Sequence, residues 1–339
     1  MQQTRTAEEL VDVLQRKDGG KGVLRPVHAI GVGVSGFFVP SQVAADYCVA
    51  EHFKARKTKV TVRFSNGSGC AQPHDGWSDV RGMATRFHLA DGAATDLIAM
   101  TLPEFFTPTG DTFYDFAVKA TPMPYTRESP WRKILDMLKL TLPLRDPYPE
   151  ETICPDVGAM GFADTQDSAK IGVFEAATIG APVSYVRAAY HAVHTFIVTG
   201  PTGTRRWVRF TWQPIAGVKT KTPEDPVVDC FLHTELGERF KAGPVPCFTL
   251  MMVIGEAGDD FDNPSRPWPP HRRRIMMGTL TVEGLAQNQT EECERLSFNP
   301  WLLTNGIEPS GDDVLRARKE AYEYSSHLRG AAPCPFSRS

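Results

Sequence analysis

The fold of this chain is decided by the stretch Arg25-Pro-Val-His28-Ala-Ile-Gly31-Val-Gly33-Val-Ser-Gly36-Phe-Phe38. Its apolar residues are typical of a strand, yet glycine recurs at positions 31, 33 and 36. Glycine at such density indicates a bend, a bulge or a group lying close to the backbone. A lone histidine in an apolar strand is usually a core residue, but the row of glycines favours a flat group beside His28.

Outside this stretch, strands dominate the middle of the chain. They are marked by alternation of apolar and polar residues and by turn residues between them. The predicted strands cover residues 58–65, 83–88, 96–101, 193–199, 206–212, 248–254 and 275–282. There is no βαβ alternation, so we expect an α+β class: one antiparallel β-barrel domain over residues 1–339, with added helices.

The helices are expected mainly at the two ends. Residues 1–20 contain Thr6-Ala-Glu-Glu9, which has the spacing of a capping box. Residues 142–167 are rich in proline, aspartate and glycine and are predicted to form a long loop. The last helix, residues 312–328, has Ser310 at the expected N-cap position and acidic residues in its first turn.

Composition excludes several classes of function. The net charge is -3, and arginine forms a run only at residues 272–274, so no nucleic-acid partner is expected. No apolar run reaches the ~18 residues that span a bilayer. The polar N-terminus predicts a cytoplasmic protein. The seven cysteines are odd in number and include no Cys-x-x-Cys, which favours free thiols over a disulfide framework or a zinc site.

The last helix places two arginines and a tyrosine on one face: Arg318, Tyr322 and Arg329. A surface helix with solvated arginines explains this pattern. Alternatively, Tyr322 is a phenolate that Arg318 stabilises from one turn away, and Arg329 meets another anion, since an unpaired buried charge is very costly. The helix alone leaves both interpretations open.

The chain resembles the haem catalases from about residue 20 to residue 330. Residues 25–38 resemble the segment that carries their distal histidine, without gaps. Further matching segments follow in the family's order: residues 62–65, 79–87, 103–106, 180–185, 193–196, 298–300 and 306–312, then Arg318, Tyr322 and Arg329. The type that it resembles most is the small catalase-related peroxidase, or mini-catalase.

This resemblance implies a haem b cofactor. Tyr322 would be the axial iron ligand, and Arg318, His194 and Asp312 would complete a network on that side. His28, oriented by Ser65, would be the acid–base residue on the other face. The resemblance further implies that the haem propionates pair with Arg25, Arg63 and Arg329. It implies apolar pocket walls formed by Val27, Ala84, Phe105, Phe106 and Phe113.

Two departures from the family are expected to matter. Catalases place an asparagine beside the distal histidine, and alignment on residues 103–106 puts Thr101 there, preceded by Met100. Threonine offers one hydroxyl and no amide. The short stretches before His28 and after Arg329 imply no long N-terminal arm and no C-terminal helical or flavodoxin-like region. We therefore expect neither the family's interlocked tetramer nor its NADPH site, and a homodimer remains open.

These features predict a haem peroxidase that reduces organic hydroperoxides or hydrogen peroxide while oxidising a small donor. A true catalase is the main alternative. An isomerase of the allene oxide synthase type ranks lower, because those enzymes carry threonine before the distal histidine and keep the asparagine, where this chain has Val27 and Thr101. A non-enzymatic haem carrier would not need His28 and Ser65 together.

Overall fold

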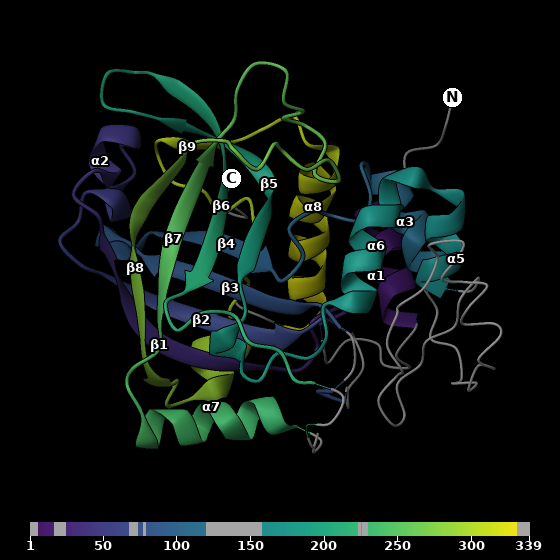
Figure 1. Cartoon of the computed structure of the whole chain (residues 1–339), viewed down its shortest axis with the longest axis horizontal. Helices are drawn as coiled ribbons and strands as arrows, with labels where there is room; N and C mark the ends of the chain where they lie inside the picture. The colour runs from purple at the N-terminus through teal and green to yellow at the C-terminus, as the bar shows by residue number, and fades with distance from the viewer. Residues whose placement is uncertain are drawn as a thin grey trace.

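An eight-stranded antiparallel barrel forms the centre of the molecule (Figure 1). The structure is a computed structural model that describes residues 6–16, 25–67, 74–76, 79–119, 158–222, 225 and 230–330. The barrel strands are β1 (Gly31–Pro40), β2 (Thr58–Asn66), β3 (Arg81–His88), β4 (Ala94–Met100), β5 (Tyr190–Thr199), β6 (Arg205–Pro214), β7 (Cys247–Ile254) and β8 (Arg274–Leu285). Each strand pairs with the next, and β8 returns to β1.

The barrel closes between β4 and β5, where Met100 pairs with His191. A short strand, β9 (Ile307–Pro309), pairs with residues 196–198 of β5, on the edge of β5 that faces away from β6. Alternate residues point into the barrel, as the period of a strand requires. Val62 and Phe64 of β2 are therefore fully buried in the core, together with Trp212 of β6. Arg63 and Ser65, the residues between and after them, face outward toward the helices.

A group of helices gathers on one side of the barrel (Figure 1). This group consists of α1 (Ala7–Arg16), α3 (Gly110–Lys119), α5 (Gly158–Thr165) and α6 (Lys170–Thr178). The long helix α8 (Asp313–Leu328) stands between this group and the barrel, and α1 and α3 both contact it. The other helices are α2 (Ala44–Tyr47), α7 (Phe231–Ala242), short 3-10 turns at Glu51–Phe53, Ala90–Gly92, Asp167–Ala169 and Tyr185–Arg187, and a π-helical turn at Thr290–Glu294.

The predicted class, an α+β fold built on an antiparallel barrel, is confirmed. The capping box is also present: the Thr6 amide donates to Glu9 Oε2 at 2.9 Å, and the Glu9 amide donates to Thr6 Oγ1 at 3.2 Å. The predicted loop at 142–167 is wrong at its end, because Gly158–Thr165 is helical. The rest of it, before residue 158, lies outside the described residues.

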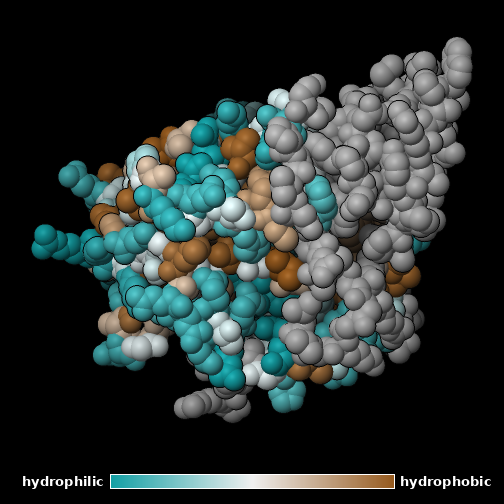
Figure 2. Space-filling model, turned by 90° about the horizontal axis from the view of Figure 1, so that it is seen from below, coloured by the Kyte–Doolittle hydropathy of each residue, from teal (hydrophilic) through white to brown (hydrophobic). Residues whose placement is uncertain are grey.

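The N-cap of α8 also differs from the prediction. Asp312, and not Ser310, caps the helix, because Asp312 Oδ1 accepts a hydrogen bond from the Leu315 amide at 3.0 Å. The coloured part of the surface in Figure 2 is largely hydrophilic, with apolar residues in small groups. Among the helices that the structure describes, none combines the length and the apolar character needed to cross a bilayer.

Candidate active site

His28, which is partly buried, and Ser65, which is buried, form a pair on the outer face of the barrel wall. Ser65 Oγ lies 3.0 Å from His28 Nδ1. His28 has a φ of +56°, which is unusual for a residue other than glycine and is often found at functional sites. Its amide donates to the Gly67 carbonyl at 3.0 Å, which holds this conformation in place. The imidazole is therefore oriented both by its backbone and by the serine.

The charge state of His28 follows from burial. Burial first, and then the nearby Arg63 and Arg318 guanidiniums, lower the pKa of His28 to about 3. The imidazole is therefore neutral at physiological pH, and one ring nitrogen keeps a lone pair. Because Arg318 belongs to α8, its effect also indicates that α8 lies near His28.

Gly82 leaves the space that the histidine fills. It pairs with Ser65 on β2 and with Met100 on β4. A Cβ atom at Gly82 would lie 2.7 Å from both His28 Nδ1 and Ser65 Oγ. Residues directly opposite each other on antiparallel strands present their side chains to the same face. Met100 therefore faces the same side of the wall as Ser65.

Thr101 forms two hydrogen bonds with the backbone of Arg81, at the end of the neighbouring strand β3. Its hydroxyl accepts a hydrogen bond from the Arg81 amide at 3.0 Å, and its own amide donates to the Arg81 carbonyl at 2.9 Å. This side chain thus completes the end of the β3–β4 ladder. The residue in register with Gly82 is Met100, one position earlier.

Three arginines lie close together beside the segment that carries His28. Arg25 and Arg63 both form ion pairs with Glu294, and Arg63 Nε lies 2.7 Å from Glu294 Oε1. Arg329, at the end of α8, donates to the Glu294 carbonyl at 3.3 Å. Arg63 also donates to the His28 carbonyl at 2.9 Å, so the cluster helps to hold the histidine segment. Sequence reasoning identified the arginines but missed Glu294, whose only signal was its position just before residues 298–300.

A continuous relay of hydrogen bonds runs from the start of α8 to Tyr322. His194 Nδ1 lies 2.6 Å from Asp312 Oδ2, and His194 Nε2 lies 2.7 Å from Arg318 Nη1. Arg318 Nη2 donates to the Tyr322 hydroxyl at 2.7 Å. Burial lowers the pKa of His194, while Asp312 opposes this shift. A neutral His194 that donates to Asp312 has Nε2 free to accept from Arg318, so the relay is internally consistent.

Apolar side chains line the space next to these groups. Phe105 stacks on Phe106 with ring centroids 4.2 Å apart and meets the edge of Phe113 at 5.2 Å. Phe113 also packs with Val27 against the cluster formed by α1 and α8. Ala84 pairs with Arg63 across the β2–β3 ladder. Of the five residues expected as pocket walls, Val27 and the three phenylalanines therefore lie in contacting apolar clusters, and Ala84 lies on the barrel face that carries Arg63.

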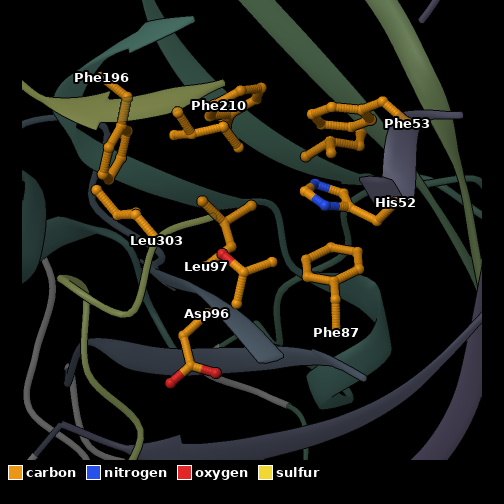
Figure 3. Close-up of a pocket in the computed structure, with 11 residues that line it drawn as sticks. His52, Phe53, Phe87, Asp96, Leu97, Phe196, Phe210 and Leu303 are labelled. Atoms are coloured by element: carbon orange, nitrogen blue, oxygen red, sulfur yellow. The ribbon is translucent and has the colours of Figure 1, made fainter. Parts of the chain in front are cut away.

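A separate small cavity lies inside the barrel (Figure 3). Its volume is about 20 Å³, close to the least that holds one water molecule. His52 lies at this cavity between the rings of Phe53 and Phe87, at 4.1 and 4.5 Å. Its Nδ1 has no hydrogen-bond partner among the described residues, and burial lowers its pKa to about 3. The cavity belongs to the core and not to the site around His28.

Comparisons with known proteins identify the family of this chain. The sequence profile named Catalase matches residues 6–142 and 160–333. A catalase-related peroxidase of Mycolicibacterium paratuberculosis is 30% identical, over 96% of this chain and 95% of that protein. A second catalase-related peroxidase, from Synechococcus elongatus, is 26% identical over 96% of this chain and 89% of its own length.

Larger relatives match over part of their length. Catalase-2 of Bacillus subtilis is 27% identical over 92% of this chain, which spans only 46% of that protein. A solved structure described as that of a bacterial catalase superposes with a TM-score of 0.73 at 19% identity, over 92% of this chain and 58% of the other. From the profile match over most of its length, together with these relatives, the chain belongs to the catalase family.

Proposed function

We propose that this protein is a haem peroxidase that reduces organic hydroperoxides or hydrogen peroxide and oxidises a small donor. The observation that carries the proposal is the relay that ends at Tyr322, with Arg318 donating to its hydroxyl at 2.7 Å. A guanidinium in this position stabilises a phenolate, which is the anionic ligand that ferric haem takes from tyrosine. The two catalase-related peroxidases that match nearly the whole chain support the same conclusion.

The residues present fit a haem group. Arg25 and Arg63 pair with the carboxylate of Glu294, and Arg329 donates to its backbone carbonyl. The three guanidiniums and one carboxylate leave an excess of two positive charges, which matches the two negative charges of the haem propionates. Arg329 Nε is buried and has no hydrogen-bond partner among the described residues, so it can still donate to an anion. Tyr322 would bind the iron, and Phe105, Phe106 and Phe113 would pack against the porphyrin.

The protein residues would then handle the proton. Haem iron, when bound, supplies the redox chemistry that breaks the peroxide O–O bond. His28, kept neutral by burial, would accept a proton from the peroxide at Nε2 and return it to the departing oxygen. For this His28 must carry its own proton on Nδ1, and Ser65 Oγ would accept a hydrogen bond from Nδ1–H and so fix the tautomer.

Parallel assays on haem-loaded protein test the proposal. Oxygen release from hydrogen peroxide is measured beside oxidation of an aromatic dye by hydrogen peroxide and by cumene hydroperoxide. We expect dye oxidation to exceed oxygen release. If oxygen release is far faster than oxidation of any donor, the protein is a true catalase. Negligible turnover of either kind would favour a haem carrier, and isomerisation of a fatty acid hydroperoxide without donor oxidation would favour an isomerase.

A further inference from the structure

On the face that carries His28, three cross-strand neighbours form a row: Ser65 on β2, Gly82 on β3 and Met100 on β4. Because Gly82 has no side chain, no Cβ atom lies between Ser65 and Met100 along this row. The side chain that borders the His28–Ser65 pair along the barrel wall is therefore a thioether.

Met100 continues into an apolar cluster. It is partly buried and packs with Phe105, Val193 and Val314, beside Phe106 and Phe113. The sulfur of methionine is only a weak hydrogen-bond acceptor, and the residue has no donor. Its long, unbranched side chain adapts well to irregular apolar groups.

The polar atoms near this row are already engaged. Ser65 Oγ is paired with His28 Nδ1, and Thr101 Oγ1 accepts from the Arg81 amide. Arg63 donates to the carbonyls of His28 and Ala29 and to Glu294. Among the polar side chains of His28, Arg63, Ser65 and Thr101, the ring nitrogen Nε2 of His28 is the group left to bind a peroxide by a hydrogen bond.

We propose that Met100 determines the choice of peroxide, favouring hydroperoxides with an apolar substituent over hydrogen peroxide. This inference rests on the proposed peroxidase function. Hydrogen peroxide carries a hydroxyl at both ends, and one of them would lose its water partners against a thioether, which is unfavourable. An alkyl or aryl substituent gains from the same contact, because it buries apolar surface.

The test compares Met100→Asn with Met100→Leu. The amide of asparagine restores a donor and an acceptor, so the ratio of kcat/KM for hydrogen peroxide to kcat/KM for cumene hydroperoxide should rise about tenfold, the effect of one additional hydrogen bond. Leucine keeps the wall apolar at similar volume, so this ratio should stay within about threefold of wild type. Met276→Asn, at a position 44% exposed on β8, is the matched control and should leave activity unchanged.

A binding measurement separates this inference from catalysis. Cyanide is titrated into the ferric protein, and its dissociation constant is read from the shift of the haem absorption band. Met100→Asn should bind cyanide several-fold more tightly than wild type and Met100→Leu. If the asparagine variant stays within twofold of wild type in both the cyanide constant and the peroxide ratio, the role of Met100 is rejected. If the proposed peroxidase function were wrong, the wild-type protein would bind haem and cyanide but would not turn over any peroxide.

Discussion

Arg318 donates a hydrogen bond of 2.7 Å to the hydroxyl of Tyr322, one turn further along α8. The other terminal nitrogen of Arg318 lies 2.7 Å from His194 Nε2, so the guanidinium has a fixed orientation. Arg318 can thus stabilise negative charge on the Tyr322 oxygen without moving. Among the tyrosines that the structure describes, this relationship supports Tyr322 as the proposed iron ligand.

Tyr322→Phe should abolish tyrosinate ligation of haem iron. Phenylalanine keeps the ring but has no oxygen to bind the metal, so the ferric absorption spectrum should change and haem should be lost more readily. Tyr324→Phe is the matched control, because Tyr324 packs against the apolar cluster of α1 and α8 and away from the relay. An unchanged iron spectrum in Tyr322→Phe would show that another residue binds the iron.

His28→Ala should lower peroxide turnover by about 10²–10⁴-fold while haem binding is retained, because the variant lacks the acid–base group. Ser65→Ala should have a smaller effect, since the serine orients the base without moving the substrate proton. The pKa of His28 is lowered to about 3, so protonation of this residue should not reduce turnover between pH 7 and pH 5. If His28→Ala turned over peroxide at a rate within threefold of wild type, His28 would have no acid–base role and would only form part of the pocket wall.

Glu294→Gln should destabilise the haem-free protein. Removing one partner of a buried pair costs about 3–5 kcal/mol, but the Glu294 side chain is 37% exposed, which reduces the expected loss to roughly 1–2 kcal/mol. The haem-loaded protein should lose less, since propionates would supply other carboxylates to Arg25 and Arg63. Thermal unfolding of both forms checks this, and an equal loss in both would argue against propionate binding by these arginines.

Thr101→Val should reduce stability and leave the choice of peroxide unaltered. Valine has the shape of threonine but leaves the buried Arg81 amide without the acceptor that Thr101 Oγ1 provides, at a cost of about 1–3 kcal/mol. Denaturant unfolding measures the loss. A shift in the ratio of hydrogen peroxide to cumene hydroperoxide turnover comparable to that of Met100→Asn would mean that Thr101 does face the substrate.

Stability of the haem-free protein should fall as the pH drops from about 6.5 toward 3, partly through His52. Its pKa is lowered from 6.5 to about 3 by burial. In this window the unfolded chain binds the proton and the folded chain does not, so the free energy of unfolding decreases with decreasing pH. His52→Phe should flatten that slope by up to about 1.4 kcal/mol per pH unit. Replacing the exposed His271 with asparagine is the control and should leave this slope unchanged. If His52→Phe also left the slope unchanged, a buried neutral His52 would be contradicted.

Much of this architecture could be predicted from local patterns. The alternation of residues 58–65 and the hairpin around residues 201–203 led to the barrel strands, since side chains of a strand alternate between two faces. Thr6 and Glu9 formed the capping box that their spacing indicated. The N-cap of α8 was placed two residues too early, because Ser310 and Asp312 are both good caps and only the backbone path distinguishes them.

The sequence by itself determined that Arg318 and Tyr322 meet, because residues four apart on a helix lie on one face. Only the tertiary structure decided that Glu294 joins Arg25, 269 residues away, since no local period links such distant positions. It also placed Met100, and not Thr101, in register with Gly82. A shift of one residue moves a strand side chain to the opposite face, and the pairing of Met100 with Gly82 sets that register.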